Sequence, residues 1–127
     1  MPPHGRGPVF GVRFPTAAWD HDHRAASPEA RAEATRWRAH VEANGLAFSE
    51  LLQATDEHTS GSALAGCVKV RIPASDDSEW GAVLTGARDA AGRPVLVFVA
   101  FGVRHPKPPS RQPTVYERAH RRLHSSD

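Results

Sequence analysis

The sequence predicts one α+β domain with a mostly antiparallel four-stranded sheet and with its helices packed on one face. Residues 94–104 form the longest apolar run. Their β-branched and aromatic content, without a 3.6-residue period, is typical of a strand buried on both faces. Residues 67–72 alternate strictly, as expected for a strand. Residues 28–44 carry apolar residues at helical spacing. The element order, a strand, two helices, three strands and a helix, predicts the α+β class.

The length and composition indicate a single folded unit. With 127 residues, of which 39% are hydrophobic, the chain is long enough for one core and too apolar to be disordered throughout. The first residues are rich in proline and glycine, so we expect a flexible tail at 1–8 and one domain at 9–124. No apolar run could span a bilayer, and the start does not resemble a signal peptide. We therefore expect a cytoplasmic protein without a membrane partner.

The N-terminal part is expected to form a strand followed by a short helix. Residues 9–14 alternate between apolar and other residues, and Pro15 ends this strand because proline has no N–H for a ladder. Residues 16–26 are expected to be helical, with Thr16 as a candidate N-cap.

Residues that could bind a metal are few and unfavourably spaced. Cys67 is the single cysteine, which excludes an internal disulfide and a cysteine zinc site, and we expect it to be a small core residue. The two histidines, His21 and His23, are two residues apart, so they do not share a helix face. The same holds for Asp20 and Asp22. We expect a solvated helix surface there, with no metal and no cofactor.

The second helix has clear start and stop signals. Ser27 is expected to be its N-cap with Pro28 in the first turn, and Gly45 follows its end. Its expected apolar stripe consists of Ala30, Ala34, Trp37 and Val41. Residues 46–55 are expected to add a further helical turn or two.

The C-terminal half is expected to supply a three-stranded antiparallel meander and a last helix. The strand at 67–72 places Lys69 and Arg71 on one face, which is either solvated or a site for an anion. Residues 80–85 and 94–104 are expected to be antiparallel neighbours joined by a turn at 88–93.

The chain's end combines a proline-rich loop with a basic helix. Residues 105–113 contain four prolines and are expected to be an extended loop before a helix at 114–124 capped by Thr114. From Arg104 onward six Lys or Arg face only Glu117 and Asp127. This end is either a cationic patch for nucleic acid or an acidic partner, or a solvated surface.

Three segments resemble the RelE/ParE toxin superfamily of bacterial type II toxin–antitoxin systems. Residues 64–72 (LAGCVKVRI) resemble the family's small loop and Lys-x-Lys/Arg strand. Residues 94–104 (PVLVFVAFGVR) resemble its last strand, which ends in Gly-x-Arg, and residues 115–123 (VYERAHRRL) resemble its C-terminal segment. The resemblance covers about 9–124, and the RelE branch fits better than the ParE branch because its functional positions are partly filled.

The resemblance implies a ribosome-dependent endoribonuclease that cuts mRNA through cationic residues. Lys69 and Arg71 would hold the scissile phosphate and help the 2′-hydroxyl to lose its proton. Arg104 would stabilise the developing charge, and Tyr116 would stack on a base. The implied partners are the ribosome, mRNA and a cognate antitoxin protein.

The sequence departs from the family pattern on the third strand, where the family's Tyr-Arg is replaced by Trp80-Gly81. Four residues near the C-terminus are further candidates for contact with RNA, and His105 is also a candidate acid or base near neutral pH. They are His105, Lys107, Arg111 and Arg118.

Two alternatives to the endoribonuclease stay open. One is a non-catalytic ParE-like gyrase inhibitor or attenuated family member that acts by binding protein, because a shared fold does not fix function. The other is a small α+β binding domain whose cations are simply solvated.

Overall fold

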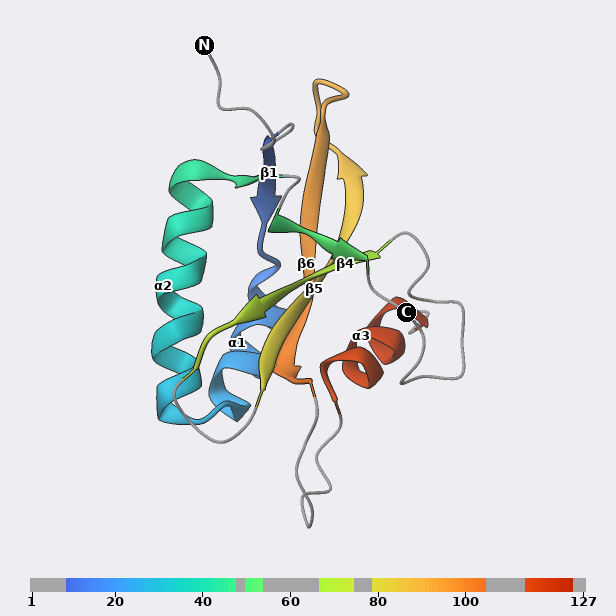
Figure 1. Ribbon diagram of the computed structural model, residues 1–127. Helices are drawn as coiled ribbons and strands as arrows, with labels where there is room; N and C mark the ends of the chain where they lie inside the picture. The colour runs from blue at the N-terminus through green and yellow to red at the C-terminus, as the bar shows by residue number, and fades with distance from the viewer. Residues whose placement is uncertain (1–8, 48–49, 54–66, 75–78, 105–113, 125–127) are drawn as a thin grey trace.

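The computed structural model describes residues 9–47, 50–53, 67–74, 79–104 and 114–124, and it has the expected α+β class (Figure 1). In chain order the elements are β1 (Val9–Arg13), α1 (Thr16–Ala25), α2 (Pro28–Asn44), β2 (Leu46–Ala47), β3 (Leu52–Gln53), β4 (Cys67–Ile72), β5 (Trp80–Arg88), β6 (Pro94–Val103) and α3 (Val115–His124). None of the described helices is both long and apolar enough to cross a membrane.

The strands form one mixed sheet in the order β2-β1-β6-β5-β4-β3. β1 runs parallel to β6, and β4, β5 and β6 form the expected antiparallel meander. The expected count of four strands is wrong, because β2 and β3 add two residues each at the two edges. The expected helical continuation is wrong at 46–47 and 52–53, which are strands, and residues 48–49 and 54–55 of the expected segment lie outside the described residues.

The C-terminal end of α2 explains why the helix does not continue beyond Asn44. Gly45 has a φ of 73°, and its N–H donates to the Val41 carbonyl, so the helix stops there as expected. The chain then turns back and pairs Leu46 with Phe10 and Ala47 with Val9. Leu46 and Ala47 are buried by this pairing, which a further helical turn would not provide.

One face of the sheet is covered by α1 and α2, over the larger apolar core. Ser27 caps α2 as expected, since its hydroxyl accepts a hydrogen bond from Ala30 N at 3.2 Å. The expected stripe of α2 is confirmed: Ala30, Ala34 and Val41 are buried, and Trp37 packs half-buried against the core.

The expected cap of the first helix is wrong. α1 begins at Thr16 itself and follows Pro15, and no side chain caps it. Trp19 from α1 packs near Phe14 and Phe98, with ring centroids 5.4 and 5.5 Å away. This aromatic packing against the sheet, rather than a cap, fixes the helix in place.

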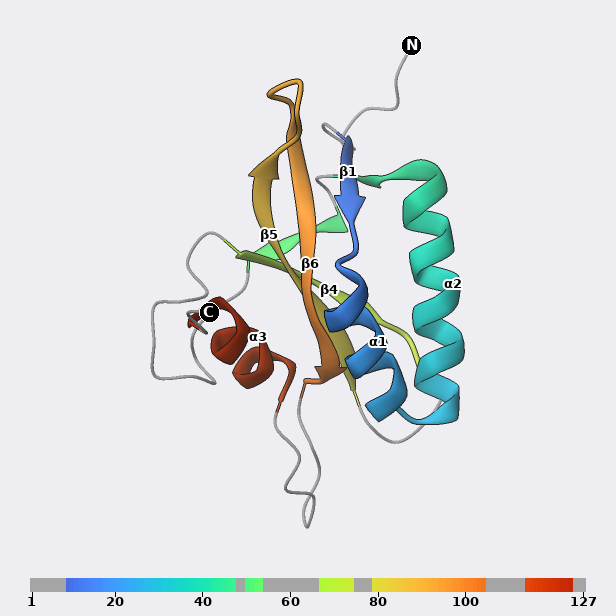
Figure 2. The ribbon, with the colours of Figure 1, turned by 180° about the vertical axis from the view of Figure 1, so that it is seen from behind.

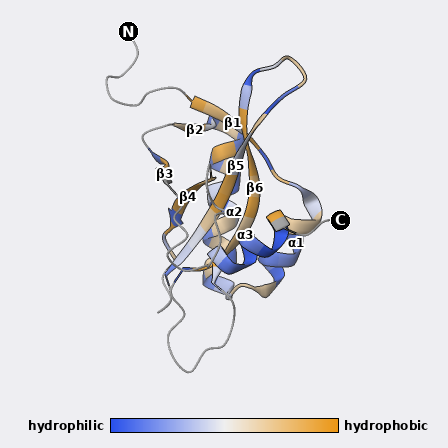
Figure 3. Ribbon diagram, turned by 90° about the vertical axis from the view of Figure 1, so that its right-hand side faces the viewer, coloured by the Kyte–Doolittle hydropathy of each residue, from blue (hydrophilic) through white to orange (hydrophobic). Residues whose placement is uncertain are grey.

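The opposite face of the sheet is covered by α3, so the expectation that all helices share one face is wrong (Figures 1 and 2). Val115, Tyr116 and Ala119 of α3 form a second core with residues of β4, β5 and β6. Figure 3 shows much of β1, β5 and β6 in hydrophobic colours and much of α1 and α3 in hydrophilic ones. The central strands are therefore buried on both faces, as their continuous apolar sequence predicts.

A β-bulge in β6 decides which residues face α3. The pairing with β5 shifts between Val83, opposite Ala100, and Leu84, opposite Phe98. Val99 is thus the extra residue, and beyond it the alternation is inverted. Phe101 and Val103 join Phe98 in the core under α1 and α2, while Ala100 faces α3. The bulge also turns Gly102 and Arg104 toward the α3 face.

Candidate functional site

Two paired glycines let other groups pack closely against the α3 face of the sheet. Gly81 of β5 pairs with Arg71 of β4 on one side and with Gly102 of β6 on the other. A Cβ at Gly102 would lie 3.6 Å from the Cα of Val115, so α3 begins close above this strand. A Cβ at Gly81 would lie 2.9 Å from Cδ of Arg104. The space that a side chain at position 81 would fill is therefore occupied by the stem of Arg104.

Arg104 is a buried cation at the end of β6. Its side chain is 9% exposed, its Nε donates to the Tyr116 hydroxyl at 3.1 Å, and its Nη1 lies 3.1 Å from Oε1 of Glu79. Its backbone N–H also donates to the Glu79 carbonyl at 2.6 Å. A guanidinium at this depth needs such partners, because burial of an unpaired charge is costly.

Tyr116 is fixed by the first turn of α3. Thr114 and Glu117 form a reciprocal capping box, in which each side chain accepts the other's backbone N–H at 3.0 Å. This confirms Thr114 as the expected N-cap. The box places the Tyr116 ring in the second core, where the residue is 1% exposed.

Lys69 joins this group from β4. Its Nζ lies 5.4 Å from the centroid of the Tyr116 ring, within the range of a cation–π contact. Lys69 is half-buried, whereas Arg71, two residues further along β4, is exposed. Lys69, Arg71, Arg104 and Tyr116 thus come from three elements to the same end of the α3 face.

The structure alters two of the expected roles. The ring of Tyr116 is buried and leaves no face for a base, so the expected stacking role is wrong in this structure. Arg118 was expected to contact RNA, but its side chain is 15% exposed and donates to Asp22 and to the Phe101 carbonyl. The other three expected RNA contacts, His105, Lys107 and Arg111, lie outside the described residues.

Sequence reasoning missed a buried polar network centred on Asp22. Beyond the end of β1, the edge of β6 is met by α1 from one face and α3 from the other. The Asp22 carboxylate accepts the Phe101 N–H at 2.8 Å and binds both Arg118 and Arg122. Arg122 in turn donates to the Val99 carbonyl at 2.8 Å. The three side chains satisfy backbone groups of the strand edge and join the two helices across it.

The network also sets the ionisation of Asp22. Burial alone raises the pKa of this carboxyl, but hydrogen bonds from Arg122, His21 and the Phe101 N–H outweigh it, so the pKa is lowered. The expected solvated helix surface is therefore wrong at Asp22. A spacing of four residues places Arg118 and Arg122 on one helix face, but no sequence signal links them to residue 22.

Other features of the described residues favour structural roles. Cys67 is buried as expected, and burial raises the pKa of its thiol, opposed by a hydrogen bond with Thr85. No group of three or more His, Cys, Asp or Glu within the described ranges could hold a metal ion.

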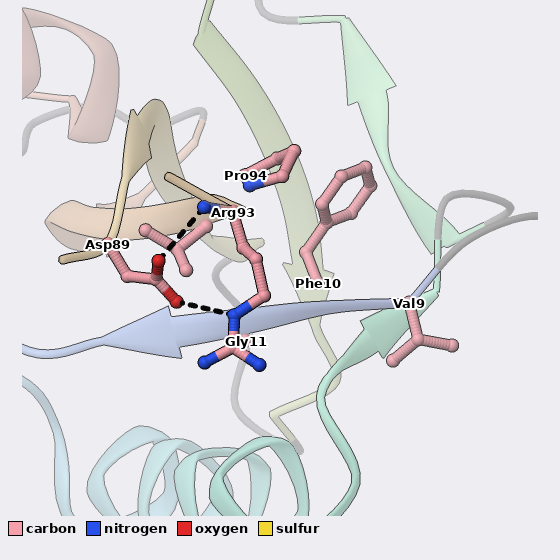
Figure 4. Close-up of a pocket in the computed structure, with 7 residues that line it drawn as sticks. Val9, Phe10, Gly11, Asp89, Arg93 and Pro94 are labelled. Atoms are coloured by element: carbon pink, nitrogen blue, oxygen red, sulfur yellow. Dashed lines mark hydrogen bonds and ion pairs between the residues drawn. The ribbon is translucent and has the colours of Figure 1, made fainter. Parts of the chain in front are cut away.

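A hollow of about 490 Å³ lies between β1 and the β5–β6 turn (Figure 4). Its floor is apolar, and its charged groups bind each other: Asp89 accepts the backbone N–H and the Nε of Arg93 at 2.9 and 3.1 Å. These contacts stabilise the tight turn, where Gly92 has a φ of 81°. The charges of this hollow therefore serve the turn.

A smaller hollow of about 280 Å³ lies beside β4 and is bordered by core residues from the α1 and α2 side of the sheet. It is lined by Trp37, Leu46, Glu50, Val70 and Arg71.

Comparisons of this chain with protein-family models, with curated proteins and with solved structures found no match.

Proposed function

We propose that this chain is a RelE-like toxin that cleaves mRNA on the ribosome by attack of a 2′-hydroxyl on the adjacent phosphate. The observation that carries the proposal is the meeting of Lys69, Arg104 and Tyr116 on one sheet face, with Arg71 beside them. The resemblance assigns roles to these four positions, and contacts link Tyr116 to Lys69 and to Arg104. Nothing in the sequence alone requires residues so far apart to touch.

The chemistry needs cations held in fixed positions. The P–O2′ bond forms as the P–O5′ bond breaks, and the proton of the 2′-hydroxyl ends on the leaving 5′-oxygen. The products are a 2′,3′-cyclic phosphate and a 5′-hydroxyl. Negative charge grows on the phosphate in between, and guanidinium and ammonium groups stabilise it when they are already oriented.

Each residue has a role that fits its exposure. Arg71 is exposed and would contact the phosphate first, and Lys69 is the neighbouring cation along β4. Arg104, which is more deeply buried than Arg71, would stabilise the negative charge that develops on the phosphate. We assign Tyr116 the role of a positioning residue, because its hydroxyl accepts a hydrogen bond from Arg104 Nε and fixes the plane of the guanidinium.

The test is an in vitro translation reaction with the purified chain, followed by primer extension on the message. Cuts that require ribosomes and disappear with Arg71→Ala are expected. Arg71 is the best first variant because it is exposed, whereas alanine at Arg104 or Tyr116 would also disturb the buried core. Arg36→Ala is the matched control, since this arginine on α2 has a 69% exposed side chain.

A second candidate function is inhibition through protein contacts without RNA cleavage. It is favoured by the burial of Tyr116 and by the ion pair that occupies Arg104. Growth arrest on expression, with no cuts in the translation reaction, would support this candidate and contradict the first. In either case we propose a cytoplasmic toxin with a cognate antitoxin as its partner, for which a basic surface is a suitable docking site.

A further inference from the structure

The ion pair between Arg104 and Glu79 is strongly asymmetric. The Arg104 side chain is 9% exposed and the Glu79 side chain is 60% exposed. The Glu79 backbone is nevertheless fixed, because its carbonyl accepts the Arg104 N–H at 2.6 Å. The carboxylate can therefore turn into water while the chain around it stays in place.

The guanidinium of Arg104 would then lack the anion that now binds its Nη1. Tyr116 binds its Nε and the methylene stem lies over Gly81, and neither contact depends on the Glu79 carboxylate. The released Nη1 would need another anion, since a guanidinium at this depth is costly to leave unpaired. Carboxylate and phosphate oxygens suit the same donors, because both match the planar fork of a guanidinium.

We propose that Glu79 is an internal anion that occupies the phosphate position on Arg104, and that RNA binds by exchanging one of its phosphates for this carboxylate. The inference rests on the proposed function for its ligand, a phosphodiester of single-stranded RNA. Lys69 and Arg71 add positive charge on the same sheet face, so the exchange is favoured by the surroundings of the site. Glu79 thereby lowers the affinity of the resting protein for anions in general.

The test measures binding of a fluorescein-labelled single-stranded RNA decamer to the full chain by anisotropy, without ribosomes. Glu79→Gln keeps the shape and one acceptor oxygen but removes the charge. An ion pair with one exposed partner is worth up to about fivefold in an equilibrium, so E79Q should bind RNA about two- to fivefold more tightly. Glu79→Asp is a second variant. Its side chain is one methylene shorter, so its carboxylate should bind Arg104 less well, and its RNA affinity should rise less than that of E79Q.

The matched control is Glu42→Gln. Glu42 lies on α2, is 51% exposed and pairs with Arg38, so E42Q changes the net charge equally but away from the site. Its affinity should equal that of the wild type. The salt dependence gives an independent readout: because the exchange leaves the number of phosphate contacts unchanged, the slope of log K against log[salt] should be the same in wild type, E79Q and E42Q.

Equal affinities for E79Q and E42Q would overturn the inference, as would the absence of RNA binding by every variant. A steeper slope in E79Q than in the wild type would also overturn it, because the wild type would then make one phosphate contact fewer. Tighter binding by E79Q together with no cleavage in the translation reaction would uphold the exchange at Arg104 and contradict the proposed reaction. The two proposals can therefore fail separately.

Discussion

Replacing Asp22 by asparagine should strongly destabilise the fold, because the side chain joins both helical layers to the edge of β6. Its carboxylate is 0% exposed and binds Arg118 and Arg122, whose side chains are 15% and 26% exposed. Removing one member of a buried ion pair costs about 3–5 kcal/mol. The partly exposed arginines can regain some water, so we expect a loss of about 3 kcal/mol.

The loss can be measured by urea unfolding at pH 7, followed by tryptophan fluorescence. Trp19 is buried in the core under α1 and should report the transition. A lower midpoint with an unchanged slope would indicate lost stability of the native state. A change of this size corresponds to a fall in Tm on the order of 10 °C for a domain of this length.

The control for this prediction is Asp20→Asn. Asp20 lies on the same helix and is exposed, so the charge change is identical, and the expected effect is within about 0.5 kcal/mol. A D22N protein within about 1 kcal/mol of the wild type would show that the Asp22 network contributes little, and would refute the reasoning.

Acid titration and the Gly81 contact give two further checks. Because the folded pKa of Asp22 is lowered, its carboxylate stabilises the fold fully above the ordinary value of about 4, and this contribution is lost as pH falls through the folded pKa. Wild type should lose unfolding free energy over that window and D22N should lose less; parallel acid curves would contradict this. At Gly81, alanine would bring a Cβ to 2.9 Å from Arg104 Cδ and 3.0 Å from the Val70 carbonyl, so G81A should cost about 1–3 kcal/mol in urea unfolding. Gly86→Ala, where a Cβ meets nothing within 4 Å, is the control, and equal stability of the two variants would refute the steric argument.

The stem of Arg104 gives a steric reason for the glycine at position 81, where the sequence differs from the pattern that it resembles. The place of Gly81 on β5 corresponds to an arginine in the resemblance, but in this structure the stem of Arg104 lies across that position. An arginine at residue 81 would displace Arg104 from Tyr116 and Glu79. The stem of Arg104, from the end of β6, therefore takes the space that a side chain at position 81 of β5 would need.

Several elements could be predicted because their signals are local. The bounds of β4 and α2 follow from strict alternation and from Ser27, Pro28 and Gly45, which act through hydrogen bonds and dihedral angles of nearby residues. The turn after β5 follows from similar short-range chemistry. The resemblance also predicts the residues of the candidate site, but not the burial of Arg104 and Tyr116.

Other features could not be predicted, because they depend on residues far apart in the chain. The segment after Gly45 has helical and strand potential alike, and pairing with β1 decided for a strand. Asp22 looked like a surface residue because its partners lie about a hundred positions away. The sequence allows Tyr116 either to stack on a base or to belong to the core, and only the packing of α3 on the sheet shows that it is buried.

By itself the sequence determined the α+β class, the central buried strand, and the start and stop of α2, since periodicity and capping are encoded within a few residues. Only the tertiary structure decided which face each cation takes. The bulge at Val99 inverts the alternation of β6, which turns Arg104 toward α3, and α3 packs on the face opposite α1 and α2. Side chains alternate with a period of two, so a single inserted residue, invisible in the pattern, changes the neighbours of everything beyond it.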